Sequence, residues 1–304
     1  MRRFWRIFMC TFLLFVTSVS VPAQQAKIVY FHRADLTEAE WAKEVVSLFN
    51  ERHPDIQAES LSSGTGGGAE YAEKLAVLWA SGNAPDVFFG STDKLGFQLK
   101  GWTLDLTPYV NKDKAAVNDA HFFPGIFETF ARDGRIYGIP LTVTPQIVFY
   151  NKDLFEKHGL PHLPVSWDDR GWTWGDLIEY SKKLTFIGAD GVATQLALTS
   201  ATENHLPDVC WMHGGDWFDE EAYRTGRATH ATMVRDENIQ AYEALRDLYE
   251  RYTVAGPPKG LDASFADGRV AMDWIGAWRL NNYVEATRTG SMKFQWGLAP
   301  VPLV

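Results

Sequence analysis

The chain has 304 residues and a formal net charge of −9 at neutral pH. Nucleic acids and anionic membrane surfaces bind clustered lysine and arginine, so an acidic chain is not expected to take either as a partner. The sequence has two cysteines, one of them in the N-terminal segment, so the core rather than an internal disulfide is expected to hold the fold.

Residues 1–23 have the composition of a secretory signal peptide. The basic residues at its start are Arg2, Arg3 and Arg6. An apolar core at 7–16 follows, which is too short to cross a bilayer as a helix, and Cys10 lacks the small-residue triplet that precedes a lipid-modified cysteine. We therefore expect a periplasmic protein of about 280 residues without stable membrane insertion. The loss of three arginines takes its net charge from −9 to −12.

In the region 24–140, strands alternate with amphipathic helices, which is typical of βα units around a mainly parallel sheet. The predicted strands are 27–33, 56–61 and 86–89, and the predicted helices are 37–52, 69–80 and 124–132. Thr37 and Glu40 form a capping-box pattern at the start of the first helix. Asp133-Gly134 predicts a turn. We expect this region to form an α/β N-terminal lobe.

The segment 141–150 is an apolar, β-branched run that is too short for a globular helix. Pro145 in its middle removes one hydrogen-bond donor, which suits an edge strand or a strand that crosses between two sheets. Asn151 is placed to cap a helix that runs to Lys157 and ends before Gly159. We interpret 141–150 as a crossing between two lobes and as a candidate hinge.

The region 151–298 is predicted to form a second α/β lobe, richer in helices. Its predicted helices are 151–157, 173–184 and 236–252, and its predicted strands are 195–199, 269–274 and 294–298. Residues 299–304 are expected to begin a second hinge crossing that returns to the first lobe.

Three stretches resemble the extracellular solute-binding proteins of the maltose-binding type, which serve sugar-importing ABC transporters. They are GIPLTVTPQIVFYNKDLFEKHGL from Gly138, WTWGDLIEYSKKLT from Trp172 and FADGRVAMDWIGAWRL from Phe265. The resemblance implies a type II periplasmic-binding-protein fold of two lobes, each a mainly parallel sheet flanked by helices. It also implies a sugar or polyol held in the cleft between the lobes, ABC permease subunits as partners, and a monomer. No cofactor, metal or catalysis is implied.

In that family a further segment normally follows the position of Val304, completing the first lobe and adding helices to both lobes. We therefore interpret the chain as a fragment of a longer protein, or as a C-terminally truncated product whose first lobe leaves apolar surface exposed.

The aromatic content favours a sugar ligand, because flat rings cover the C–H faces of sugars while polar groups meet the hydroxyls. Aromatic residues make up 14% of the chain, and tryptophans concentrate at Trp167, Trp172, Trp174, Trp211, Trp217, Trp274 and Trp278. For any one of them apart from Trp278, packing in the core or on the surface is the favoured role. Trp278 is the strongest candidate because Gly276, where a strand turns into a helix, lets the backbone approach a ligand. The resembling family has a sugar-stacking tryptophan at this place.

Transferred position by position, the resemblance implies a ligand site built from loops and from the crossing. Its residues are Arg33, Asp35, Asp93, Lys94, Thr144, Glu203, Asn204 and Trp278. The chain departs from maltose binders at Gly90, where they have tryptophan, and at Thr144, where they have an acidic residue. A generic sugar site is therefore expected in place of a maltose site. For Arg33, Asp35 and Asp93 a solvated loop charge is the alternative.

The glycine-rich pattern at 64–69 matches a dinucleotide fingerprint of the GxGxxA type. The acidic residue that follows it, Asp86, opens its strand, whereas a ribose-binding carboxylate stands at the carboxyl end of one. We therefore interpret the pattern as a glycine loop without a nucleotide.

Metal and hydrolase chemistry have little support in the sequence. His205, Cys210 and His213 are too few on one face for zinc, which takes three or four protein ligands. Asp168, Asp169 and Asp216 show no pairing that would select two of them as the carboxylates of a glycosidase. A secreted carbohydrate-active enzyme and a non-binding remnant stay as the rival interpretations.

Overall fold

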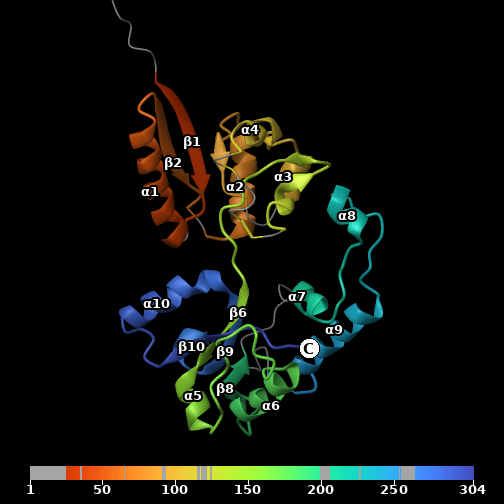
Figure 1. Cartoon of the computed structure of the whole chain (residues 1–304). Coiled ribbons are helices and arrows are strands. Elements are labelled where there is room, and N and C mark those ends of the chain that lie inside the picture. The colour runs from red at the N-terminus through yellow and green to blue at the C-terminus, as the bar shows by residue number, and fades with distance from the viewer. Residues whose placement is uncertain are drawn as a thin grey trace, which may run out of the picture. The chain divides into compact units, whose positions relative to one another are not determined.

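The computed structural model describes residues 25–34, 36–64, 66–90, 94–114, 117, 122–123, 125–198, 206–225, 227–252, 254 and 264–304. The chain divides into two compact units, Met1–Thr92 and Asp93–Val304. Figure 1 labels the elements of both. The predicted signal peptide, 1–23, lies outside the described residues. Within the described part, no helix has both the length and the apolar character needed to cross a bilayer. The lobe limits and the hinge at 141–150 stay predictions.

Three strands of the first unit form a parallel sheet in the order β2-β1-β3. The strands are β1 (Ala26–His32), β2 (Ile56–Ser62) and β3 (Val87–Phe88), and the helices between them are α1 (Leu36–Arg52) and α2 (Gly68–Ala80). The parallel order predicted from the strand–helix alternation is confirmed, because each helix returns the chain to the same end of the sheet.

Buried contacts join these helices to the sheet. In α1, the Asn50 side chain donates to the carbonyl oxygen of Ala58 at 2.9 Å and accepts from its amide at 2.7 Å. In α2, the ring of Tyr71 stacks on Phe31 with centroids 4.8 Å apart, and its hydroxyl donates to the Phe31 carbonyl oxygen at 3.2 Å. The polar atoms at these contacts are paired, which avoids a penalty of about 1–3 kcal/mol for each unsatisfied buried group.

The second unit begins with short elements. They are α3 (Lys94–Leu99), α4 (Thr107–Lys112), η2 (Glu128–Phe130), β4 (Ala131–Arg132) and β5 (Arg135–Ile136). The prediction of a helix over 124–132 is wrong, because the end of that range pairs as a strand with β5. Asp133 and Gly134 have φ values of 49° and 72°, as a tight hairpin turn requires, so the turn prediction is confirmed and the hairpin prevails over helix propensity.

Five strands form the main sheet of this unit in the order β10-β6-β9-β8-β7. They are β6 (Gln146–Asn151), β7 (Phe186–Ile187), β8 (Ala193–Leu198), β9 (Val270–Gly276) and β10 (Trp296–Ala299). Of their pairings only β8 with β9 is parallel. The expectation of a mainly parallel second sheet is therefore wrong, since β6 runs against both of its neighbours, β9 and β10.

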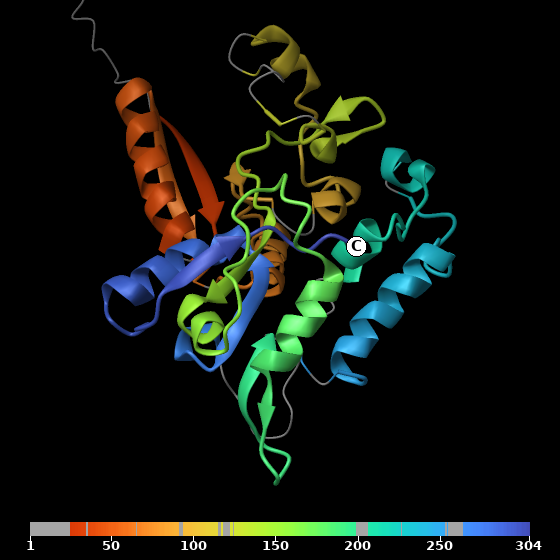
Figure 2. The ribbon, with the colours of Figure 1, turned by 60° about the horizontal axis from the view of Figure 1, so that its bottom comes forward.

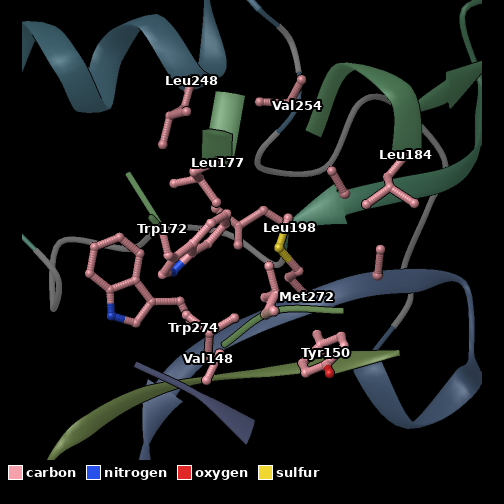
Figure 3. Close-up of a cluster of buried hydrophobic side chains, with 14 of the residues drawn as sticks. Val148, Tyr150, Trp172, Leu177, Leu184, Leu198, Leu248, Val254, Met272 and Trp274 are labelled. Carbon is pink, nitrogen blue, oxygen red and sulfur yellow. The ribbon is translucent and has the colours of Figure 1, made fainter. Parts of the chain in front are cut away.

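One face of this sheet packs against α6 (Trp174–Leu184), α7 (Leu206–Met212) and α9 (Asp236–Tyr249). Figure 3 shows Leu177 and Leu248 from two of these helices over Leu198, Met272 and other strand side chains. Burying an aliphatic side chain of this size contributes about 1.5–3 kcal/mol. This face holds the largest cluster of buried side chains among the described residues of this unit. The apolar periodicity of α6 and α9 agrees with this placement.

The other face of the sheet packs against α10 (Leu280–Arg288) and η4 (Phe265–Asp267), which Figure 2 shows from another side. Phe149 meets the ring of Tyr283 edge-on, with centroids 4.9 Å apart. The Tyr283 hydroxyl donates to the carboxylate of Asp273, which is buried in β9. Helices on both faces confirm the α/β class.

Two helix starts carry side-chain caps, and the cap at Asn151 is the one that the sequence predicts. The Asn151 side chain accepts from the amide of Leu154 at 3.0 Å at the start of α5 (Lys152–Lys157). Thr173 and Asp176 form a reciprocal capping box at the start of α6. The remaining helical pieces are α8 (Glu220–Thr225) and η5 (Ala277–Arg279).

Candidate functional site

The amino end of β6 and the carboxyl end of β9 meet at one edge of the second unit's sheet. Gln146 pairs with Gly276 in the antiparallel ladder, and the Ala277 amide donates to the Pro145 carbonyl oxygen at 2.9 Å. The predicted strand 141–150 thus begins later than expected, directly after its proline, which cannot donate to a ladder. Thr144 and Trp278, two of the predicted ligand residues, are brought to this edge by the pairing.

Gly276 gives the ring of Trp278 its place. A Cβ atom built on Gly276 would stand only 1.7 Å from Cζ3 of Trp278, so the indole fills the space in which any other side chain would begin. The backbone of Gly276 is extended, with φ −64° and ψ 148°, so close approach rather than an unusual conformation requires the glycine. Trp278 keeps 54% of its surface exposed. One aromatic surface is therefore held against the backbone while the rest of the residue stays open to solvent.

Strand alternation decides which side chains share the face with this ring. Gln146 lies on the same face as Val148, and Gly276 on the same face as Trp274, because residues two apart in a strand point the same way. The Trp278 ring fills the side-chain position of Gly276, so it lies on that face beside Gln146. An amide side chain and an aromatic ring are thus adjacent at the sheet edge.

Two further tryptophans continue this face inward. Trp274 is buried and lies beside Val148 in Figure 3. Its ring meets Trp174 at the start of α6 edge-on, at 6.1 Å, and Trp174 meets the ring of His213 in the same manner at 6.4 Å. These contacts place Trp174 and Trp274 in one aromatic cluster, and Trp274 lies on the same face of β9 as Gly276.

Of the other predicted ligand residues, Arg33 belongs to the first unit. Its Nε atom pairs with Glu38 at 2.7 Å, its amide donates to the same carboxylate at 3.1 Å, and its guanidinium carbon lies 5.2 Å from the ring centre of Phe89. Glu38 is buried, so this ion pair has a structural role whether or not Arg33 also meets a ligand.

The remaining predicted ligand residues have no described side chain. Lys94 begins α3, and only its backbone is described. The residues that lie outside the described part of the chain are Asp35, Asp93, Glu203 and Asn204. Their place in the site stays a prediction.

Sequence reasoning did not single out Gln146. A signal was nevertheless present, because a glutamine between Pro145 and a run of apolar residues is the one polar side chain at the start of a strand that is otherwise buried. A polar residue in such a place has either a structural partner or a functional one.

The predicted tryptophan clusters divide between the core and the surface. Trp172 is buried, and its Nε1 atom donates to the Pro300 carbonyl oxygen at 3.0 Å. Trp167 and Trp211 are, like Trp278, more than half exposed. Exposure alone therefore does not distinguish Trp278, and its position against Gly276 does.

Several residues that were considered for nucleotide or metal binding have structural roles. The Asp86 carboxylate accepts a hydrogen bond from the Val29 amide at 2.8 Å and so joins β1 to the start of β3. Cys210 is buried in the core, where burial raises the pKa of its thiol. His213 has its Nδ1 atom 2.9 Å from the Val209 carbonyl oxygen. His205 lies outside the described residues, within which no three metal-capable side chains gather.

Two of the three candidate glycosidase carboxylates, those of Asp169 and Asp216, accept local hydrogen bonds. The Asp169 carboxylate accepts from the Gly171 amide at 2.8 Å, whereas Asp168 takes part through its backbone amide, which donates to the Ser166 hydroxyl at 3.2 Å. Burial opposes the ionisation of Asp216, but hydrogen bonds, led by the one from the Tyr223 hydroxyl at 2.5 Å, outweigh it and lower its pKa. A general acid needs a raised pKa, so Asp216 does not fit that role.

Two hollows of the second unit lie away from this edge. One of about 660 Å³ is lined by residues of α5, η4 and the segments before β9 and β10, including Lys157, Arg269 and Lys293. The other, of about 410 Å³, is lined by residues that include Arg132 and Glu221. Neither is lined by Thr144, Gln146 or Trp278.

Known proteins resemble this chain over most of its length. The arabinooligosaccharide-binding protein of Halalkalibacterium halodurans is 24% identical over 252 residues, which cover 80% of this chain and 52% of that protein. The sn-glycerol-3-phosphate-binding periplasmic protein UgpB of Pectobacterium atrosepticum is 25% identical, with 93% and 62% covered. The chain thus spans between half and two-thirds of the length of these relatives.

A solved structure extends the comparison to the fold. The ABC substrate-binding protein Lmo0181 of Listeria monocytogenes, solved in complex with cycloalternan, superimposes with a TM-score of 0.72 at 25% identity. The match covers 91% of this chain and 67% of that one. The type II periplasmic-binding-protein fold predicted from the sequence is thereby confirmed.

The same relationship appears at the level of the family. The family model described as bacterial extracellular solute-binding protein matches residues 33–304, a range that includes the first unit from residue 33 onward, the whole second unit and the edge formed by β6 and β9. The chain therefore belongs to the bacterial extracellular solute-binding protein family.

Proposed function

We propose that the protein captures a sugar or a related polyol and delivers it unchanged to an ABC importer. The observation that carries this proposal is the ring of Trp278, which is held against Gly276 at the edge of the sheet and remains more than half exposed. A flat ring in such a position can cover the C–H face of a sugar, while Thr144 nearby offers a polar group to its hydroxyls.

The relatives support this ligand class. The H. halodurans protein is named for arabinooligosaccharides, and the L. monocytogenes protein was solved with cycloalternan. The P. atrosepticum relative is named for sn-glycerol 3-phosphate, a small polyol derivative. We infer a polyhydroxylated ligand on these grounds. The two lobes, hinged at 141–150, would close around this ligand. Because the ligand would bind the closed state more tightly than the open state, it would shift the conformational equilibrium toward the closed state.

The cellular setting follows from the same proposal. Family membership indicates an extracellular protein, and the predicted signal peptide at 1–23 supports export to the periplasm. The partners would be the permease subunits of the importer, met by a monomeric binding protein. Its acidic charge agrees with a neutral ligand better than with an anionic one.

The test compares binding with turnover in one experiment. Purified protein is titrated calorimetrically with arabinotriose, maltotriose, mannobiose and glycerol 3-phosphate, and each mixture is then analysed for products. Saturable heat with unchanged ligand is expected for at least one saccharide. Cleavage products would replace the proposal with a carbohydrate-active enzyme. An absence of heat and of any rise in melting temperature with every ligand would indicate a remnant that does not bind.

A further inference from the structure

Gln146 is an exception on an apolar face. It is the first residue of β6, and the next residues on its face, Val148 and Tyr150, are buried in the main core. The Oε1 atom of Gln146 is buried and has no hydrogen-bond partner among the residues that the structure describes. Unpartnered buried polar atoms destabilise a fold, and natural proteins contain few of them.

The position of this atom suggests what it serves. Gln146 pairs directly with Gly276, and the ring of Trp278 fills the side-chain position of that glycine. A hydrogen-bond acceptor without a partner therefore lies next to an exposed aromatic surface. A sugar ring needs these two groups side by side, one for a hydroxyl and one for its C–H face.

We propose that the Gln146 side chain is a ligand-binding group that pairs with a hydroxyl of a saccharide whose ring lies on Trp278. The inference rests on the proposed function and adds the residue that recognises a hydroxyl at a fixed place beside the ring. A hydroxyl both donates and accepts, so it can pair with either end of the amide. Gln146 thereby favours a neutral, hydroxylated ring over a ligand that offers only apolar surface at this position.

The stability of the free protein provides the first arm of the test. Replacing Gln146 with leucine or with methionine removes the unpaired amide and keeps a side chain of similar length. Without ligand, both variants are expected to melt at the wild-type temperature or about 2–4 °C above it. The matched control is Gln195→Leu in β8, because Gln195 donates to the Leu184 carbonyl oxygen at 2.8 Å. That variant is expected to melt at a lower temperature.

Binding provides the second arm. Calorimetry is performed with the saccharide that the wild-type protein binds, chosen from arabinotriose, maltotriose and mannobiose. Gln146→Leu and Gln146→Met are expected to weaken its affinity by about tenfold or more. One monodeoxy analogue of the same saccharide should bind the wild-type protein about tenfold more weakly and should show no further loss with Gln146→Leu.

The outcomes separate this inference from the proposed function. If the wild-type protein binds none of the saccharides, the proposed function fails and the inference fails with it. If the wild-type protein binds one of them and both Gln146 variants bind it equally well, only the inference is overturned. A loss of melting temperature as large as that of Gln195→Leu would show a structural role for Gln146 and would also overturn it.

Discussion

The indole of Trp278 stands where the side chain of residue 276 would begin, so the glycine at that position and the tryptophan two residues later depend on one another. The contact lies at the end of β9, beside the first residue of β6. A change at either residue should therefore act on the exposed ring before it acts on the fold.

Replacing Gly276 with alanine is expected to displace the ring of Trp278. The extended backbone tolerates alanine, but its Cβ would stand 1.7 Å from the ring, so the ring must move. We expect the affinity for saccharide to fall by about tenfold or more, since stacking depends on the ring's position. The measurement is calorimetric titration, with Gly175→Ala as the control. A Cβ on Gly175 meets only the Thr173 hydroxyl at 3.6 Å, so that variant should bind normally.

Replacing Trp278 with alanine tests the ring itself. If the ring covers a sugar face, its loss should cost about 1–3 kcal/mol of binding free energy, with little change in melting temperature because the residue is half exposed. The control is Phe186→Ala, which removes a 43% exposed ring from edge strand β7. Equal affinity of Trp278→Ala and wild-type protein would show that the ring has no part in binding.

Replacing Asn151 with alanine should destabilise the second unit without touching the ligand edge. Asn151 is buried and caps α5 through its bond to the Leu154 amide, and loss of such a cap costs about 1 kcal/mol. Urea unfolding should show this loss in the free energy of unfolding, whereas the affinity for saccharide should be unchanged. If the fully folded variant bound saccharide more weakly than wild-type protein, the loss of the cap at the end of β6 would have altered the site at the start of that strand.

The pair of Tyr283 and Asp273 predicts a loss of stability at alkaline pH. Burial, and then the neighbouring Asp273 carboxylate, raise the pKa of Tyr283 above its ordinary value of 10.0. The folded protein therefore holds this proton more tightly than the unfolded chain does. The corresponding stability is complete below about pH 10 and is lost as the pH rises further toward the folded pKa.

The variant Tyr283→Phe isolates this effect. It leaves the buried carboxylate without its hydroxyl partner, so at neutral pH it should be less stable by about 1–3 kcal/mol. The difference from wild-type protein should narrow above pH 10 in urea unfolding curves. If the free energies of unfolding of the two proteins differed by the same amount from pH 7 to pH 11, the raised pKa of Tyr283 would be contradicted.

Local sequence signals predicted much of the second unit's framework. Asn151 was identified as a helix cap because a cap is a short-range pattern, and the Asp133-Gly134 turn is equally local. The helix expected over 124–132 failed because residues 131–132 pair with 135–136, a competition that propensity alone does not resolve. The direction of β6 relative to its neighbours also depends on long-range pairing, which the sequence does not display.

The candidate site could be proposed in part from the sequence. Trp278 was proposed from Gly276 and the turn that follows the strand, and Thr144 from the resemblance, and the ligand role of both stays a prediction. Their proximity could not be derived from the residues, because it depends on the ladder between Gln146 and Gly276. Gln146 itself escaped notice because its significance depends on an atom without a partner, a property of the packed structure.

Cys210 has a consequence for experiments on motion. Its thiol is enclosed between α7 and α9, and burial keeps it protonated, so an alkylating reagent can react only after these helices separate. The rate at which Cys210 is alkylated in the native protein would therefore depend on how often α7 and α9 separate. The reactivity of the native Cys210 thiol would therefore report local opening of the second unit without an engineered label.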